Sequence, residues 1–223
     1  MPGQIVKILD KKLLTHDVIF FRVEKPAGFF FNPGQAIDIS INKPGWAEKK
    51  NPFSMTSLPR DNYVEFIIKT YPSRKGFTDE LLSLDKNDEL ILHDVFGTIN
   101  YQGKGTFIAG GAGITPFISI FRELQSKNEI QGNMLIFGNK TSADIILKKE
   151  LDILFGDKFI NILSHEKQQG YEFGMITEDF LEEHIPDLRK KFYLCGPPPM
   201  IKLVLKALYN LGVPESSIIK EEF

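Results

Sequence analysis

The first hundred residues contain short runs in which apolar and polar residues alternate, separated by turn-forming residues. The runs are rich in Ile, Val and Phe and cover 4–9, 18–24, 36–42, 63–70 and 89–93. Short strands at this spacing predict an antiparallel barrel or sandwich. One helix is expected in this half, over Phe77–Leu84.

Beyond Gly103 the pattern changes, and buried strands alternate with amphipathic helices. The strand and helix pairs are 106–109 with 116–125, 133–137 with 143–154, 159–164 with 178–184, and 191–194 with 199–211. This alternation predicts βαβ units and a parallel sheet covered by helices on both faces. Ile218 and Ile219 predict a further edge strand. We therefore expect an antiparallel β-barrel domain over residues 1–101 and a parallel α/β domain over residues 102–223.

Charge and composition narrow the possible functions. The 223 residues carry a formal net charge of -2, with 27 Lys and Arg against 29 Asp and Glu, so we expect no nucleic-acid partner. Cys195 is the single cysteine, which rules out an internal disulfide and an iron–sulfur cluster. A redox centre would therefore be a bound cofactor. No apolar stretch approaches the ~18–20 residues of a membrane span and no signal-peptide core is present, so we expect a cytoplasmic protein.

A glycine-rich turn follows the strand 106–109 and runs Gly110-Gly111-Ala112-Gly113-Ile114-Thr115-Pro116. Glycines at a strand-to-helix junction let the backbone approach a pyrophosphate, whose charge the helix N-terminus favours. Pro116 stands where the first turn of a helix tolerates proline. The alternative is a purely structural turn, which the motif alone leaves equally open.

A second motif, Cys195-Gly196-Pro197-Pro198-Pro199-Met200, ends another expected strand. Ligands of open parallel sheets bind outside the carboxyl ends of the strands, so Cys195 and the glycine turn are expected to face one crevice. The alternative is that Cys195 is a small buried apolar residue. The four histidines are scattered without ligand spacing, and we expect no metal site.

Taken in order, these motifs resemble the ferredoxin–NADP reductase superfamily. Four segments carry the resemblance: Asn51-Pro52-Phe53-Ser54, Gly76-Phe77-Thr78, Gly110–Pro116 and Cys195–Met200. The resemblance covers essentially the whole chain and implies a flavin-binding barrel followed by a nucleotide-binding domain. It further implies an oxidoreductase that takes a hydride from NAD(P)H onto one bound flavin.

The resemblance implies a flavin site in the first domain. Phe53 stands where an aromatic ring stacks on the isoalloxazine, and Ser54 stands where a hydroxyl meets flavin N5. Gly76 and Thr78 match the turn beneath the flavin pyrophosphate. The remaining members of the set are Asn51, Pro52, Ile68, Lys69 and Phe77.

Phe53 replaces the tyrosine that is usual in the family, which keeps the stacking face, but a second departure affects the flavin phosphates. Asn51 replaces an arginine that contacts the flavin pyrophosphate, and an amide lacks the cationic fork. The departure leaves FMN as an alternative to the preferred FAD. The missing charge could come from neighbouring basic residues, which would otherwise form a solvated surface: Lys49, Lys50, Arg74 and Lys75.

The resemblance also implies where the nicotinamide binds. Thr115 and Cys195 flank it, and Glu221, with Glu222 as the alternative, supplies a nearby carboxylate. Phe223 covers the flavin face that the nicotinamide must occupy, the alternative being that it is only a terminal tail. Ser54, Cys195, Glu221 and Phe223 thus form the expected reaction centre. The dinucleotide-binding set adds Gly110, Gly111, Gly113, Pro116, Gly196 and Met200.

The choice of dinucleotide depends on the loop after the second strand of the α/β domain. That loop contains Lys140, followed by Thr141 and Ser142, with no carboxylate before Asp144. A cation favours a 2′-phosphate, so NADP(H) is preferred and NAD(H) is the alternative. Thr141 and Ser142 could equally cap the next helix.

The electron acceptor is expected to be a separate ferredoxin or flavodoxin, or a small molecule. A flavin reductase that releases reduced flavin would share the same fold. A non-catalytic subunit that binds flavin or nucleotide is the alternative that Asn51 favours.

Overall fold

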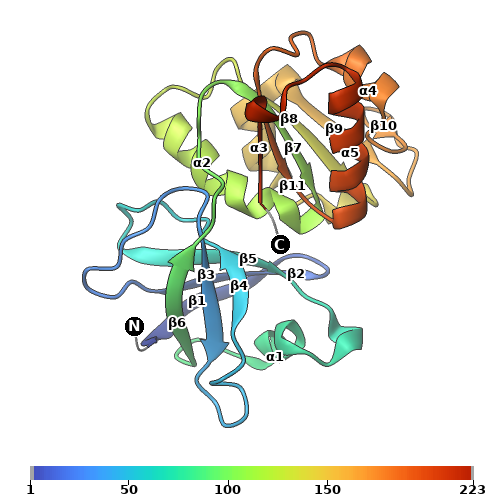
Figure 1. Ribbon diagram of the computed structural model, residues 1–223. Helices are drawn as coiled ribbons and strands as arrows, with labels where there is room; N and C mark the ends of the chain where they lie inside the picture. The colour runs from blue at the N-terminus through green and yellow to red at the C-terminus, as the bar shows by residue number, and fades with distance from the viewer. Residues whose placement is uncertain (1–2, 222–223) are drawn as a thin grey trace. The chain divides into compact units, whose positions relative to one another are not determined.

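The computed structural model describes residues 3–221 and consists of two compact units. The first unit runs to Asn100 and also includes Thr115–Glu123, whereas the second comprises Tyr101–Ile114 and the chain from Leu124 onward. Within the described residues the strands form two six-stranded sheets, one in each unit (Figure 1). The start of the helix after the glycine turn is therefore packed with the first unit.

The first sheet is antiparallel and has the order β4-β3-β6-β1-β2-β5. The long strand β1 pairs with β6 through residues 4–7 and with β2 through residues 8–15. Its register with β2 shifts between Ile8 and Asp10, just after its pairing with β6 ends at Lys7. The strands are β1 (Gln4–Thr15), β2 (Val18–Glu24), β3 (Ala36–Ile41), β4 (Asn51–Ser54), β5 (Tyr63–Lys69) and β6 (Glu89–Phe96).

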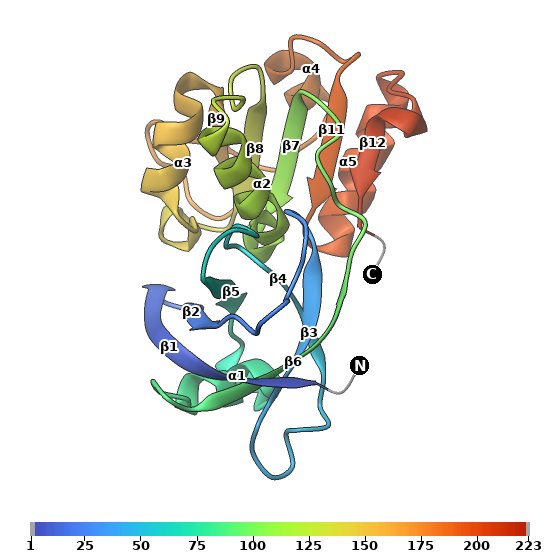
Figure 2. The same ribbon diagram turned by 90° about the vertical axis from the view of Figure 1, so that its left-hand side faces the viewer.

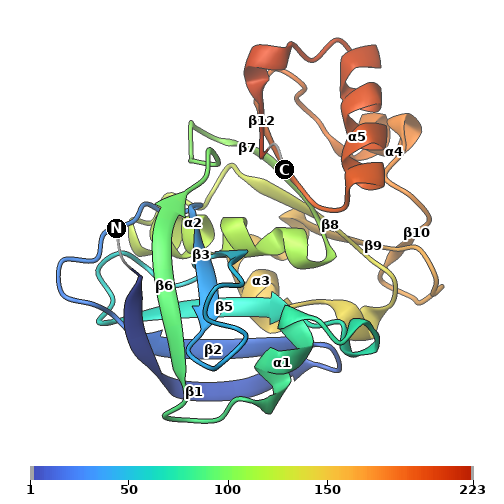
Figure 3. The same ribbon diagram turned by 60° about the horizontal axis from the view of Figure 1, so that its bottom comes forward.

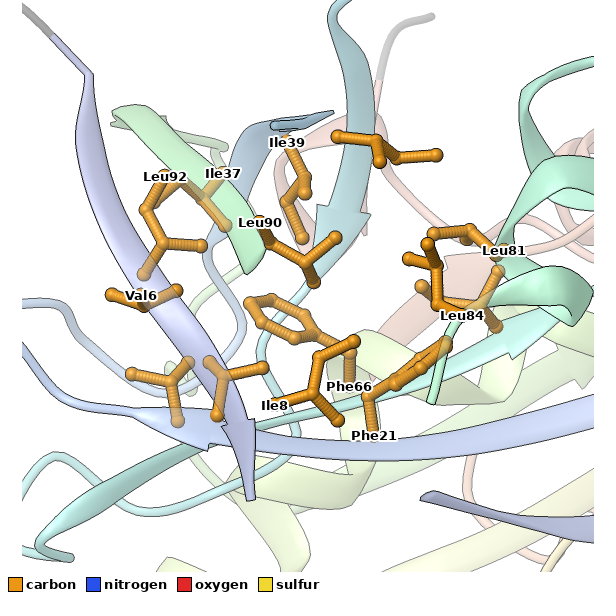
Figure 4. Packing of buried hydrophobic residues seen from close by; sticks show 14 of the residues in the cluster. Val6, Ile8, Phe21, Ile37, Ile39, Phe66, Leu81, Leu84, Leu90 and Leu92 are labelled. Atoms are coloured by element: carbon orange, nitrogen blue, oxygen red, sulfur yellow. The ribbon is translucent and has the colours of Figure 1, made fainter. Parts of the chain in front are cut away.

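The core of the first unit consists of the inward side chains of this sheet together with α1 (Phe77–Ser83). Phe21 and Phe66 pack there beside Leu81 and Leu84 (Figure 4). Figure 3 shows α1 alongside the antiparallel strands. The ammonium of Lys11 donates to the carbonyls of Leu82 and Leu84, which satisfies backbone groups at the end of α1.

The second sheet is parallel, with the order β10-β9-β8-β7-β11-β12. Every residue of β7 is buried, as expected for a central strand with both faces covered. The strands are β7 (Gly105–Gly110), β8 (Met134–Asn139), β9 (Phe159–Leu163), β10 (Glu172–Phe173), β11 (Lys191–Cys195) and β12 (Ile218–Lys220). The expected combination of an antiparallel barrel-like domain and a parallel α/β domain is confirmed.

Helices cover both faces of the parallel sheet, and Figure 2 shows α3 and α5 on opposite sides of it. The helices α4 and α5 pack together over Ile108, Ile136 and Ile162. Their bounds are α2 (Thr115–Ser126), α3 (Lys148–Phe155), α4 (Glu178–His184) and α5 (Pro198–Asn210). The 3-10 helices are η1 (Pro72–Arg74), η2 (Gly111–Ile114), η3 (Ser142–Asp144), η4 (Gly156–Lys158) and η5 (Glu215–Ser217). Among residues 3–221 no helix combines the length and apolarity that crossing a membrane requires.

Candidate functional site

The two flavin motifs of the first unit meet through a pair of aromatic rings. Phe53 lies on the edge strand β4, opposite Ile37 of β3, and Phe77 opens α1. Their rings stack with centroids 5.9 Å apart, and Phe77 also contacts Trp46 at 6.2 Å. The structure therefore brings Asn51–Ser54 together with Gly76–Thr78. Because Phe53 is half-buried, part of its surface remains for a ligand ring.

The cations near this pair differ in what they contact. Lys49 lies over the ring of Trp46 at 4.1 Å, and Arg74 lies over Tyr71 at 4.6 Å. Both charges are thus held partly by aromatic faces. Lys50 and Lys75 are exposed.

Two further members of the expected flavin set lie at the end of β5. Ile68 points into the core, so only its backbone can reach a cofactor from there. Lys69 forms an ion pair with Asp17 at 2.8 Å. Gly76 is the N-cap of α1 and has no side chain with which to cap it.

In the second unit the glycine turn packs directly on the Cys195 motif. The strands β7 and β11 are neighbours, with Ala109 opposite Cys195. A Cβ on Gly113 would lie 2.3 Å from the carbonyl oxygen of Cys195, and one on Gly110 would lie 2.5 Å from the sulfur of Met200. These two glycines are therefore needed for packing within the protein. Gly111 has a φ of +51° and open space around its Cβ direction, so this part of the turn remains accessible to a ligand.

The thiol of Cys195 is buried at the carboxyl end of β11. Burial, and next the charge of Glu221, raises the pKa of Cys195 to about 12. The group is therefore a neutral thiol at physiological pH and not a nucleophile. Glu221 follows β12, whose Lys220 pairs with Leu194, so this carboxylate lies at the same sheet edge. Glu222 and Phe223 lie outside the described residues, and the expected placement of Phe223 stays a prediction.

The loop after β8 is held by two carboxylates. Asp144 accepts hydrogen bonds from the backbone N–H of Thr141 at 2.8 Å and from its hydroxyl at 2.7 Å. Glu166 accepts from the backbone N–H of Ser142 at 2.6 Å. Thr141 thus caps η3 in a capping box. This agrees with the alternative in which the residues after Lys140 cap the next helix. Lys140 is exposed.

Glu166 was not found by sequence reasoning. It follows β9, and the parallel pairing of Leu163 with Asn139 brings it to the loop after β8. In the sequence, Glu166 is recognisable only as a carboxylate that follows the strand β9. Its relevance to the loop after β8 requires knowing that β9 is the neighbour of β8 in the sheet.

Both units match families of cofactor-binding domains. Residues 4–96 match a family model described as an FAD-binding domain, and residues 107–206 match the oxidoreductase NAD-binding domain. NADH-cytochrome b5 reductase 1 of Eremothecium gossypii is 30% identical over 240 residues, which cover 98% of this chain and 83% of the relative. The chain belongs to the ferredoxin–NADP reductase superfamily.

Some relatives are longer than this chain. The reductase component of propane 2-monooxygenase from Rhodococcus jostii is 31% identical over 230 residues, or 94% of this chain. The chain spans 60% of the length of that relative and 64% of its counterpart in Mycolicibacterium goodii.

Solved structures agree on the superfamily fold. The flavohem-like FAD/NAD-binding domain of nitric oxide dioxygenase from Vibrio cholerae has a TM-score of 0.88 at 21% identity, covering 100% of this chain and 99% of that one. A ferredoxin NADP+ reductase from Neisseria gonorrhoeae with bound FAD and NADP has a TM-score of 0.84 at 18% identity, covering 99% and 98%. At these identities the likeness establishes the fold alone.

For a member of this superfamily the expected site residues fall into two groups. Those of the flavin set lie in the first unit. Thr115 and Pro116, which belong to the dinucleotide set, also lie in the first unit, buried at the start of α2. Those of the dinucleotide set from Gly110 to Gly113, together with Cys195, Gly196 and Met200, lie in the second unit.

Proposed function

We propose that this chain is a flavin-dependent reductase that oxidises NADH with a bound FAD and passes electrons to a separate protein. The observation that carries the proposal is the succession of an FAD-binding domain over residues 4–96 and an NAD-binding domain over residues 107–206. The flavin, when bound, supplies hydride acceptance and release of electrons one at a time. The chain itself binds, orients and shields the reactants.

The residues of the first unit fit a flavin. The half-buried ring of Phe53, which stacks on Phe77, offers a stacking face, and the hydroxyl of Ser54 follows it in the same strand. FAD is favoured over FMN by the family that residues 4–96 match. Lys50 and Lys75, exposed near the same motifs, take over the charge that Asn51 lacks.

The residues of the second unit fit a dinucleotide. Gly111 leaves the open part of the turn for the pyrophosphate. The neutral thiol of Cys195 provides a small, uncharged contact for a nicotinamide ring, and its raised pKa keeps a second negative charge away from Glu221. No acid–base pair is required, because hydride transfer depends on orientation and on exclusion of water.

The dinucleotide is NADH, because the loop after β8 disfavours a 2′-phosphate. Its backbone donors at Thr141 and Ser142 are occupied by Asp144 and Glu166. A 2′-phosphate would meet two carboxylates there, whereas ribose hydroxyls can donate to them. NADH also appears in the name of the Eremothecium gossypii relative. This proposal replaces the preference for NADPH that rested on Lys140.

The acceptor is a separate protein with a metal redox centre. Relatives are named as the reductase component of propane 2-monooxygenase and as NADH-cytochrome b5 reductases. These names favour an oxygenase component or a b-type cytochrome over a ferredoxin or flavodoxin.

Purification followed by anaerobic titration tests the proposal. The protein is expected to retain FAD, to lose its visible flavin absorbance on addition of NADH, and to reduce cytochrome b5 without added free flavin. A protein that binds no flavin, or whose flavin neither NADH nor NADPH reduces, would overturn it. Turnover that requires added free flavin would identify a flavin reductase instead.

A further inference from the structure

The first unit buries a carboxylate that none of the expected cofactor sites uses. Glu65 lies in the middle of β5, and its side chain is only 3% exposed. Its Oε1 accepts from the guanidinium of Arg122 at 2.5 Å and from the hydroxyl of Thr56 at 2.9 Å. Arg22 approaches its Oε2 at 3.6 Å. A carboxylate so deeply buried requires such partners to remain charged.

Arg122 links this carboxylate to the segment that follows the flavin motif. Its Nη1 also donates to the carbonyl of Thr56 at 2.9 Å, two residues after Ser54. Thr56 in turn donates its backbone N–H to the carbonyl of Glu65 at 2.8 Å. One guanidinium of α2 therefore contacts both β5 and the segment that extends β4.

A second contact holds the same face of α2. The hydroxyl of Ser119, which is fully buried, accepts from the backbone N–H of Gly34 at 3.0 Å. Thr115, Ser119 and Arg122 recur at intervals of four and three residues and therefore share one helix face. This face is packed within the first unit, to which Thr115–Glu123 belong.

We propose that Glu65 and Arg122 are positioning residues that set Thr115 against the flavin-binding strand. The inference rests on the proposed function, in which Thr115 contacts the nicotinamide and Ser54 the flavin. Arg122 lies about 10 Å along the helix from Thr115, so any tilt of α2 at Arg122 displaces its first turn. Hydrogen bonds of a buried ion pair are directional, whereas apolar contacts permit sliding. Hydride transfer is sensitive to displacements of about 1 Å.

The test compares an apolar pair with the ionic one. Removing Glu65 alone would take the carboxylate from Arg122, and removing Arg122 alone would leave Glu65 with Arg22 at 3.6 Å as its remaining cation. The informative protein is therefore the double variant Glu65→Leu/Arg122→Met, which replaces the Glu65–Arg122 pair by apolar side chains without directional bonds. We expect it to fold, to retain FAD and to bind NADH within about twofold of the wild type. Its limiting rate of flavin reduction by NADH should fall roughly tenfold to a hundredfold in stopped-flow measurements. The charge-transfer absorbance of the nicotinamide–flavin complex should weaken in parallel.

A neighbouring ion pair provides the control. Arg60 and Glu123 join the same helix to the same unit at 2.6 Å, but Arg60 is 52% exposed. Exposed pairs contribute little. The variant Arg60→Gln/Glu123→Gln should reduce its flavin at the wild-type rate with unchanged charge-transfer absorbance.

The variant Arg122→Lys gives a second, independent measurement. Lysine keeps the charge but lacks the planar fork that reaches both Glu65 and Thr56, so reduction should slow while the fold is kept. If the double variant does not fold, the reduction rate of Arg122→Lys decides between the proposal and a purely structural role.

The outcomes separate the two proposals. If the double variant or Arg122→Lys shows the wild-type reduction rate and charge-transfer absorbance, the ion pair has only a structural role. This outcome would overturn the positioning inference and leave the proposed function unaffected. A wild-type protein whose flavin neither NADH nor NADPH reduces would overturn the proposed function.

Discussion

Replacing Glu166 with glutamine is expected to lower the proposed preference for NADH over NADPH. The carboxylate accepts a hydrogen bond from the backbone N–H of Ser142 at 2.6 Å. Glutamine keeps an oxygen that can accept this bond and removes only the charge. The loop should therefore keep its conformation while its repulsion of a 2′-phosphate decreases.

The size of the effect follows from Coulomb's law. A 2′-phosphate beside the loop would stand about 6 Å from this carboxylate and carry a charge of about −1.5 to −2. With an effective dielectric constant of about 40 to 80, the repulsion amounts to roughly 1–3 kcal/mol. The ratio of kcat/KM for NADH to that for NADPH should fall by about tenfold, and by less at high salt.

The assay is steady-state reduction of ferricyanide with each dinucleotide at low and high ionic strength. Asp157→Asn is the matched control, because Asp157 is 84% exposed and pairs with Lys158 instead of the loop. If Glu166→Gln leaves the ratio unchanged at low salt, or shifts it as little as the control does, the repulsion argument is refuted.

Three further predictions concern single side chains. Phe53→Ala should weaken flavin binding by about 1–3 kcal/mol in a calorimetric titration, and unchanged affinity would remove Phe53 from the site. Lys140→Ala should raise the KM for NADPH by up to about tenfold and that for NADH less, whereas equal effects would make Lys140 a bystander. Burial and Glu221 raise the pKa of Cys195 from 9.0 to about 12, so its contribution to stability is present below pH 9 and is lost as the pH rises toward 12. Between pH 9 and pH 12 the free energy of unfolding of the wild type, measured in urea, should fall by about 1.4 kcal/mol per pH unit more than that of Cys195→Ala. Equal pH dependence of the two free energies would contradict the burial argument.

Local patterns of the chain predicted the two sheets and the meeting of two motifs. Strands that alternate apolar and polar residues have one face covered, which is typical of antiparallel sheets. Apolar strands that alternate with helices have both faces covered, which is typical of parallel sheets. The glycine turn and Cys195 both end strands of one parallel sheet, and the structure packs them together. Both inferences needed only short stretches of sequence.

Elements stabilised by distant partners were harder to predict. The strand β4 contains Pro52 and no alternating apolar run, yet it pairs with β3 at the sheet edge, where proline is tolerated. The helix expected over residues 143–154 begins only at Lys148, because Leu147 adopts a left-handed conformation with a φ of 53°. Such departures arise from tertiary contacts that override local preference.

The contacts on which the present proposals rest became visible only in the tertiary structure. Glu65 and Arg122 are 57 residues apart in sequence, and Ser142 and Glu166 are 24 apart. In sequence each is an ordinary charged or polar residue, because a charge acquires its partner and its burial only when distant segments are packed together. The sequence by itself therefore determined the architecture and the motif positions, whereas folding decided which glycines have open space around them, which carboxylates accept hydrogen bonds from the loop after β8 and which ion pair joins α2 to β5.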